Sequence, residues 1–277
     1  MRKRALVTGA NSGIGKAAAL GIAKAGYDVT LVVRNPARGE AAAKEIRAAA
    51  PGTTVDLLEM DLSMQLSIRE GAKEFLEAHD KLDVLVNCAG VFLKERQETE
   101  DNLERTFATN YLAYFLLTNQ LLPALKAAAP SRIVNVSSRY GNTTLDFDDL
   151  QVKKREYTFY RAVAPTMLAR VLFTQEAAER LKGDGITVNC LHPGLVKGTQ
   201  LLGEVGGIFK VLVALFGKSP AKGADTAVWL ATSPEAANAT GKMWAKRKEM
   251  ATPGMGSDPA ARKRLWQESE RLTGATW

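Results

Sequence analysis

Cysteine is scarce in this sequence, and long apolar runs are missing from it. Cys88 and Cys190 are too few for a disulfide framework, and each lies in or beside an apolar, strand-like run that suits a reduced core cysteine. No apolar run reaches the roughly 18 residues that a membrane span needs, and "MRKRALVTG" leads straight into a strand without a signal-peptide core. We therefore expect a cytoplasmic protein with no integral membrane segment.

Repeats, low-complexity tracts and recognised nucleic-acid-binding modules are also missing from the 277 residues. Hydrophobic residues make up 46% and charged residues 24%, which is typical of a soluble globular protein, and α/β folds often use a chain of this length for a single core. The net charge is +7, but the positive residues are scattered, with one cluster at Lys242 to Lys248. We predict one domain over residues 1–277 and no nucleic-acid partner, and we assign the positive charge to a solvated surface or to attraction of an anionic cofactor.

Short β-branched runs alternate with longer stretches that carry apolar residues at helical spacing. This pattern predicts a parallel sheet with helices on both faces, a doubly wound α/β architecture of the Rossmann type. Its ligand should lie beyond the carboxyl ends of the strands. The predicted strands are Arg4–Gly9, Asp28–Arg34, Thr53–Met60, Lys81–Asn87, Ser131–Ser138 and Gly185–Gly194.

The first strand leads into "VTGANSGIGK", a glycine-rich turn before a predicted helix. Glycines at this spacing let the backbone approach a pyrophosphate, and the helix then points its first N–H groups at the phosphates. A tight strand–helix turn without a ligand would have the same glycines. The ends of the later strands, "NCAG", "SS" and "HPG", favour the nucleotide interpretation.

Together these motifs make the sequence resemble the short-chain dehydrogenase/reductase family, in its retinol-dehydrogenase-like branch. The resemblance runs from "TGANSGIGK" through "NCAGV", "TNYLAYFLLT", "RIVNVSS", "LFTQEAAERL" and "HPG" to the tail "DPAARKRLWQESERLTG". It implies an NADP(H)-binding oxidoreductase that holds no metal. Family members often associate through the helix that carries the catalytic tyrosine and lysine, which leaves a homo-oligomer open.

The resemblance also implies which residues bind the cofactor. The glycine loop would hold the phosphates, two residues after the third strand would flank the adenine, and the fourth strand would end in the floor of the site. The HPG turn would approach the nicotinamide, where Thr199 stands one position after the family's usual hydroxyl. These residues are Gly9, Asn11, Ser12, Gly13, Ile14, Gly15, Asp61, Leu62, Asn87, Ala89, Gly90, Pro193, Gly194, Val196 and Thr199.

The second strand ends in Arg34, where an acidic residue would accept hydrogen bonds from the free 2′-hydroxyl of NAD. A guanidinium pairs well with a phosphate, so Arg34, helped by Asn35 and Arg38, favours the 2′-phosphate of NADP(H). The alternative is that Arg34 is an ordinary surface residue.

The catalytic region resembles the family in only two of four positions. Ser138 matches the serine that polarises the substrate carbonyl, and Asn110 matches the family asparagine; each could instead be structural. With "LFTQEAAERL" as the anchor, Val163 and Met167 stand at the tyrosine and lysine positions. A tyrosine works as an acid near neutral pH only beside a cation, so ordinary ketone reduction should be impaired.

Two further expectations concern the same segment. Pro165 is comfortable only in the first turn of a helix, which predicts a helix that starts at or just before Ala164 and leaves Val163 at the mouth of the site. Tyr157 or Tyr160, with Arg161 nearby, could replace the missing acid from the preceding loop.

The resemblance places an apolar substrate lid at residues 198–218 and a tail helix at residues 257–277. A packed core helix or a membrane-surface helix are alternatives for the apolar stretch Leu201 to Phe216. Together with Val163 and Met167, this stretch predicts a hydrophobic small-molecule substrate.

These observations favour a reductase acting on an electrophile that needs no protein acid, such as an iminium ion or an enone. Three alternatives stay open: a non-redox cyclase or isomerase on the same scaffold, a cofactor-binding pseudoenzyme, and an active carbonyl reductase in which Val163 and Met167 are replacements.

Overall fold

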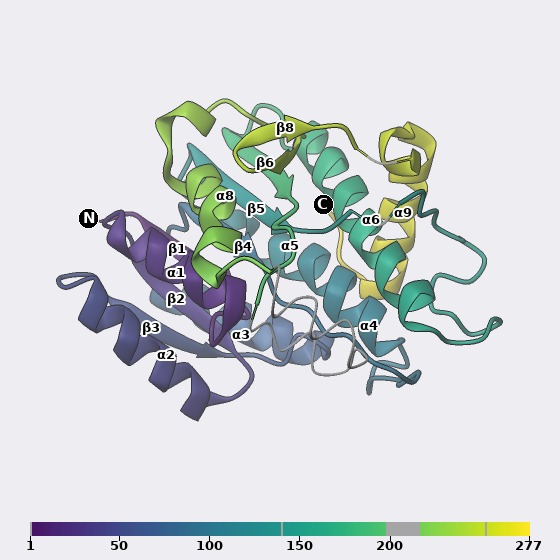
Figure 1. Ribbon diagram of the computed structural model, residues 1–277, viewed down its shortest axis with the longest axis horizontal. Helices are drawn as coiled ribbons and strands as arrows, with labels where there is room; N and C mark the ends of the chain where they lie inside the picture. Colours follow the sequence, from purple (N-terminus) through teal and green to yellow (C-terminus); the bar gives the residue numbers. More distant parts are fainter. Residues whose placement is uncertain (1, 140, 198–216, 253) are drawn as a thin grey trace.

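An eight-stranded sheet forms the centre of the protein, and helices cover both of its faces (Figure 1). The computed structural model describes residues 2–139, 141–197, 217–252 and 254–277. The strand order is β3-β2-β1-β4-β5-β6-β7-β8, and every neighbouring pair is parallel except the antiparallel pair β7 and β8. The predicted single-domain, doubly wound parallel sheet of the Rossmann type is confirmed.

The six predicted strands are present, each slightly shorter than its apolar run. A short hairpin, β7 and β8, was not predicted and holds the basic cluster Lys242 to Lys248, with Lys246 and Arg247 at positive φ in its turn. The strands are β1 (Arg4–Thr8), β2 (Asp28–Val33), β3 (Val55–Glu59), β4 (Val84–Asn87), β5 (Ser131–Val136), β6 (Ile186–Leu191), β7 (Met243–Ala245) and β8 (Lys248–Met250).

Most helices begin at a side-chain cap. Asn35, Thr158, Ser219 and Asp258 each accept a hydrogen bond from a backbone N–H of the first turn, which satisfies a donor that the helix itself cannot. The helices are α1 (Gly13–Lys24), α2 (Pro36–Ala49), α3 (Gln65–Ala78), α4 (Arg105–Phe107), the π-helix η1 (Ala108–Leu112), α5 (Ala113–Ala127), α6 (Phe159–Arg180), α8 (Pro220–Thr232) and α9 (Pro259–Thr273), with 3₁₀ turns η3 (Pro234–Ala236) and η4 (Gly254–Ser257).

The two faces of the sheet carry separate apolar cores. Helices α1, α2 and α8 pack on one face, and α3, α5, α6 and α9 pack on the other (Figure 1). Alternate strand residues point to opposite cores, as with Leu6 and Val7 of β1, because successive side chains of a strand alternate. None of the helices in the described ranges is long and apolar enough to cross a bilayer.

The parallel strands give the sheet two distinct edges. We call the side where β1, β4, β5 and β6 end the carboxyl edge, and the side where they begin the amino edge. The sequence motifs at the strand ends therefore all lie on the carboxyl edge, where ligands of such sheets bind.

Candidate functional site

The glycine-rich turn after β1 is held in a shape that needs glycine. Gly9 has φ +64°, and a Cβ at Gly15 would lie 2.3 Å from the carbonyl oxygen of Gly9. No side chain fits such a contact, so strand β1 and helix α1 approach each other more closely than other residues allow.

The first turn of α1 has donors that its own cap residue does not satisfy. Ser12 is the N-cap in extended conformation, but its side chain makes no capping hydrogen bond, in contrast to the caps of α2, α6, α8 and α9. Half-buried Asn11, Ser12 and Gly13 border this turn, and Ile14 and Gly15 are buried at its base. Unsatisfied N–H groups at a helix N-terminus attract an anion, so this turn fits a phosphate group.

The end of β2 carries two exposed arginines. Asn35 is the cap of α2, and its Oδ1 accepts from the backbone N–H of Arg38 at 2.9 Å, so this oxygen is engaged at the start of the helix. Arg34 lies just beyond Val33, and its side chain makes no hydrogen bond or ion pair with any residue in the described ranges. The guanidinium is therefore available to a phosphate ligand.

Two adjacent segments join this turn at the carboxyl edge. The Asp61 carboxylate accepts from the N–H and the hydroxyl of Ser63, which folds the chain after β3 into a tight turn beside buried Leu62. Thr8 at the end of β1 accepts from the backbone N–H groups of Cys88 and Ala89. The chain after β4 is thereby fixed against the glycine loop.

Asn87 ends β4 within a buried hydrogen-bond chain. Its Nδ2 donates to Asn135 Oδ1 at 3.0 Å and to Thr118 Oγ1 at 3.2 Å, and Asn135 in turn donates to Thr174 of α6. These contacts connect β4, β5, α5 and α6. Asn87 thus stabilises the end of β4, from which the chain continues to half-buried Ala89 and Gly90 of the predicted cofactor floor.

Asn110 lies in the π-helix η1 and is wholly buried. Its Oδ1 accepts from Val91 N at 2.7 Å, and its Nδ2 donates to Val91 O at 2.9 Å. Both ends of the amide are therefore occupied by one backbone unit just after Gly90. This geometry makes Asn110 a positioning residue, and π-helical turns often occur at such functional positions.

Ser138 and His192 meet at the carboxyl ends of the neighbouring strands β5 and β6. The Ser138 hydroxyl lies 3.5 Å from His192 Nδ1, and both side chains are half-buried. Burial lowers the pKa of His192, and the positive charges of Lys218 and Arg139 lower it further. The imidazole is therefore held neutral near pH 7, where it can accept a hydrogen bond from Ser138.

The HPG turn follows His192 and closes this side of the edge. Pro193 and Val196 are buried, and Gly194 has φ +80°. A backbone bridge between Val196 and Lys218 holds the turn against the start of α8. Thr199 and residues 198–216 of the predicted substrate lid lie outside the described residues.

The prediction that α6 starts near Ala164 is wrong. The helix begins at Phe159, because the Thr158 hydroxyl accepts from the N–H of Arg161 and starts the helix one turn earlier. Pro165 stands inside the helix. Val163, expected at the mouth of the site, has 0% of its surface exposed, so it packs in the interior.

Met167 is buried as well, with 4% of its surface exposed, and its carbonyl accepts from the hydroxyl of Ser137 at 2.8 Å. This contact connects the position where the resemblance expects a lysine to the end of β5, next to Ser138. The two positions where the resemblance expects a phenol and an ammonium are thus filled by packed apolar side chains.

Neither alternative tyrosine forms a hydrogen bond with Ser138 in the described structure. Tyr157 bonds Thr106 Oγ1 at 2.8 Å and donates to Glu104 at 3.0 Å. Burial raises the pKa of Tyr157, and the nearby Glu104 charge acts in the same direction, which is the opposite of what an acid requires. The Tyr160 side chain is 54% exposed, with its hydroxyl 3.4 Å from Thr143, and Arg161 pairs with Glu156.

Arg170 is a buried charged residue that sequence reasoning missed. It lies on α6 three residues after Met167, is 3% exposed, and donates to the backbone carbonyls of Ala89, Asn110 and Val136. A lone arginine in the apolar stretch "MLARVLFT" is the sequence signal that could have identified it, because a buried charge requires dedicated partners.

His192 was also missed, although the HPG motif itself was recognised. The signal was its position: it follows β6 directly, so its side chain lies at the carboxyl edge beside the serine that ends β5. By contrast, Cys88 and Cys190 take no part, because burial raises the pKa of each thiol to about 12 and keeps it protonated.

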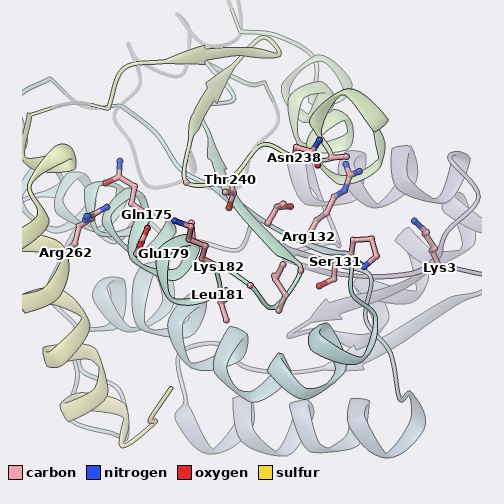
Figure 2. A pocket seen from close by; sticks show the side chains of 18 of the residues that line it. Lys3, Ser131, Arg132, Gln175, Glu179, Leu181, Lys182, Asn238, Thr240 and Arg262 are labelled. Atoms are coloured by element: carbon pink, nitrogen blue, oxygen red, sulfur yellow. The ribbon is translucent and has the colours of Figure 1, made fainter.

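A cavity of about 760 Å³ lies on the opposite, amino edge (Figure 2). Figure 2 shows Arg262 and Glu179 on one side of it and Lys3 and Arg132 on the other. Its lining comes from the starts of β5 and β6, from the end of α6 and the chain after it, and from the segments around Lys3, Thr240 and Arg262. It includes none of the predicted site residues. The cavity is therefore separate from the site predicted by the motifs.

Comparison with protein families finds the short chain dehydrogenase model matching residues 3–206. Among curated proteins, the chain is 41% identical to human (Homo sapiens) retinol dehydrogenase 13 over 284 residues, which covers 98% of this chain and 85% of that protein. It is 39% identical to human retinol dehydrogenase 14, with 98% and 86% covered.

Solved structures give the same result. An uncharacterized protein from Mycobacterium paratuberculosis superposes with a TM-score of 0.80 at 28% identity, covering 99% of this chain and 94% of that one. A short chain dehydrogenase from Burkholderia cenocepacia, solved in complex with NADP, has a TM-score of 0.70 at 26% identity, with 87% and 94% covered.

Proposed function

The chain belongs to the short chain dehydrogenase family, and from this premise we propose that it is an NADP(H)-dependent reductase of hydrophobic, already activated electrophiles. The substrate that we propose is an iminium ion or an enone. One observation carries the proposal: the carboxyl edge keeps the nucleotide turn, Asn110 and Ser138, while Val163 and Met167 are packed apolar residues at the acid positions.

The described residues fit a bound dinucleotide phosphate. The glycine turn leaves the N–H groups at the start of α1 without a side-chain cap, and the Arg34 guanidinium has no partner among the residues that the structure describes. We assign the pyrophosphate to the first and the 2′-phosphate to the second, since a guanidinium binds phosphate in a bidentate way. This assignment favours NADP(H) over NAD(H).

When bound, the reduced cofactor supplies a hydride. The chain itself contributes binding, orientation and hydrogen bonding. Asn110 holds the backbone of Val91 and so fixes the segment that starts at Gly90. The Ser138 hydroxyl can donate a hydrogen bond to the carbonyl oxygen of an enone, or turn its oxygen toward a positively charged iminium ion, with His192 beside it.

In the described part of the chain, neither Tyr157 nor Tyr160 is placed to replace the missing acid. General acid catalysis contributes about 10²- to 10⁴-fold to such reactions, and it needs a group whose pKa lies near the working pH. The pKa of Tyr157 is raised, and its hydroxyl is bonded to Glu104. A substrate that already carries positive charge, or that takes its proton from water, avoids this loss.

A hydrophobic substrate is the second part of the proposal. Val163 and Met167 remove two polar groups from α6 next to the end of β5, and relatives with about 40% identity carry the name retinol dehydrogenase. Retinoids are apolar, so a terpenoid-like or polycyclic electrophile is the class we would test first.

The test is a spectrophotometric assay of NADPH consumption with three matched substrates: an iminium ion, an enone and a simple ketone. We expect turnover of at least one of the first two, and little or none of the ketone. Ser138→Ala should reduce this turnover, whereas Ser257→Ala, on the amino edge, should leave it unchanged.

Other outcomes would favour the alternatives. NADPH binding without turnover of any electrophile would indicate a cofactor-binding protein that is not a reductase. Turnover without NADPH consumption would indicate a cyclase or isomerase. No NADPH binding would contradict the proposal altogether.

A further inference from the structure

The guanidinium of Arg170 lies inside the protein, directly behind the segments that form the predicted site. Its Nη1 donates to Val136 O at 2.7 Å, its Nη2 to Ala89 O at 3.1 Å, and its Nε to Asn110 O. The ring of Tyr114 stacks on the guanidinium, with 4.1 Å between Cζ and the ring centroid. Carbonyl oxygens and an aromatic face are the neutral groups that best stabilise a buried cation.

The three carbonyls belong to three different segments. Ala89 follows β4 and precedes Gly90, Asn110 is the middle of the π-helix, and Val136 ends β5 two residues before Ser138. One side chain therefore fixes the relative positions of the predicted cofactor floor and of the serine that would contact substrate.

Gly90 shows how close the charge lies to the predicted cofactor floor. A Cβ at Gly90 would lie 3.3 Å from Nη2 of Arg170 and 3.2 Å from Oδ1 of Asn110. Gly90 is half-buried and has no side chain to separate the guanidinium from the predicted cofactor floor. At such short range, within the low dielectric of the interior, a full charge is felt strongly.

We infer that Arg170 positions the segments of this site and also supplies its fixed positive charge. It would take over the charge of the lysine that the resemblance expects at position 167. One consequence, the preference for NADPH over NADP⁺, rests on the proposed function. The oxidised nicotinamide ring is positively charged and the reduced ring is neutral. A buried cation behind Gly90 therefore disfavours NADP⁺ and favours NADPH.

Met167 and Arg170 form a matched pair in this arrangement. Nη1 of Arg170 lies 3.5 Å from Sδ of Met167, one helical turn away on the same face of α6. A lysine at position 167 would bring an ammonium group against the guanidinium in a buried environment. The apolar residue at 167 is thus a condition for the cation at 170.

The first experiment measures Kd for NADPH and for NADP⁺ by fluorescence titration, without any substrate. The neutral variant Arg170→Gln should lower the ratio Kd(NADP⁺)/Kd(NADPH) by about fivefold or more, because the repulsion of the oxidised ring is removed. Arg170→Lys keeps the charge, so the ratio should stay within about twofold of that of the unaltered protein.

Arg180→Met is the matched control. Arg180 lies on the same helix and stacks on an aromatic ring, Trp266 at 4.3 Å, but at the other end of α6. Its removal should leave the ratio unchanged. If Arg170→Gln weakens the binding of both cofactor forms equally, Arg170 is only a structural residue and the electrostatic inference is wrong.

The second experiment needs no cofactor and compares thermal unfolding of four proteins: unaltered, Met167→Lys, Arg170→Gln and the double variant. Met167→Lys should lower Tm by about 5 °C or more when Arg170 is present, and clearly less in the Arg170→Gln background. Equal losses in both backgrounds would contradict the matched pair. If Arg170→Gln alone does not fold, Met167→Lys is instead compared in the unaltered protein and in the Arg170→Lys background. Both should show the loss of Tm. A lysine at 167 that leaves Tm unchanged would contradict the proposed dependence between positions 167 and 170.

The two proposals fail in different ways. A protein that binds neither NADPH nor NADP⁺ contradicts the proposed function, while the unfolding experiment still decides the Met167–Arg170 pair. A protein that binds both forms with a ratio insensitive to Arg170→Gln keeps the proposed cofactor and loses only the inference about charge.

Discussion

The two edges of the sheet use arginines in different ways, one half-buried and one buried. On the amino edge, Arg132 at the start of β5 donates to Leu230 O at 2.9 Å and to Ser233 O at 2.8 Å, both at the end of one helix, α8. On the carboxyl edge, Arg170 reaches three segments that are 34, 60 and 81 residues away in the sequence. The first arginine completes a helix end, while the second holds a site together.

The edges also differ in how their described polar groups are paired. The 760 Å³ cavity is on the amino edge, where Arg4 pairs with Asp56 at 2.6 Å and Arg132 is bonded to carbonyls. The carboxyl edge instead has an uncapped helix N-terminus and the partly exposed pair Ser138 and His192. At the amino edge these groups are bonded to a carboxylate or to carbonyls, whereas the N–H groups at the start of α1 have no side-chain cap that would compete with a ligand.

The largest effect expected at the carboxyl edge follows from Gly15→Ala. The new Cβ would lie 2.3 Å from the backbone oxygen of Gly9, which cannot move without distorting the phosphate turn. We expect NADPH binding to weaken by about 100-fold, with overpacking costing about 1–3 kcal/mol of stability. Isothermal titration with NADPH and a denaturant titration measure the two effects.

Gly183→Ala on the amino edge provides the contrast. Gly183 has φ +111° and lines the cavity, and no atom lies within 4 Å of its added Cβ. The strain of a positive φ should reduce stability, but NADPH binding should not change. Equal losses of NADPH affinity in both variants would mean that general destabilisation, and not the turn, controls binding.

Charge reversal gives the second largest effect. Arg34→Glu should weaken NADPH binding by about 30-fold and improve NADH binding, because a carboxylate repels the 2′-phosphate and accepts from a free 2′-hydroxyl. Lys3→Glu makes the same change of charge at the amino edge and should have little effect at moderate salt. Unchanged preference for NADPH in Arg34→Glu would contradict the assignment of this arginine.

Much of the fold could be predicted because the strands have a strong local signal. Buried parallel strands need continuous β-branched runs, and all six runs became strands. The β7–β8 hairpin was missed because its strands have three residues each, too few for a pattern, and because its turn places Lys246 and Arg247 at positive φ, which these residues seldom adopt.

Only those site residues that belong to contiguous sequence motifs could be predicted. The glycine turn and the strand-end serine are local features, and the structure places them on one edge. The predicted start of α6 was wrong because it rested on Pro165 alone, whereas the Thr158 cap starts the helix at Phe159 and leaves the proline inside it. Arg170 could not be assigned a role, since its partners are backbone carbonyls that carry no side-chain signal in the sequence.

The third prediction compares the packing of the two edges. Val163→Tyr places a large ring at a position with no exposed surface, and such overpacking typically costs about 1–3 kcal/mol. Thr187→Tyr is the matched change at the amino edge, where half-buried Thr187 lines the cavity and the ring can extend into it. Denaturant titration should show a loss for the first variant and little for the second. Full stability of Val163→Tyr would show that this position opens onto usable space.

The smallest effect concerns the two histidines, one on each edge. Burial is the main cause of the lowered pKa of both. At His192, the positive charges of Lys218 and Arg139 lower the pKa further. At His79, Arg4 also lowers the pKa, but the negative charges of Asp56, Asp28 and Asp80 raise it. A depressed pKa in the folded state means that the unfolded chain binds the proton more readily. Stability is then complete above the unfolded value of about 6.5 and declines as the pH falls below it.

Thermal unfolding between pH 8 and pH 5 should therefore show a falling Tm, and His192→Gln should flatten that fall more than His79→Gln. The reason is that no acidic group opposes the positive neighbours of His192 among those that shift its pKa, whereas three aspartates do so at His79. Glutamine keeps a polar side chain at each position and removes only the titration. If both variants change the slope of Tm against pH equally, burial alone sets the two pKa values. The positive charges of Lys218 and Arg139 would then not make the carboxyl edge electrostatically different from the amino edge.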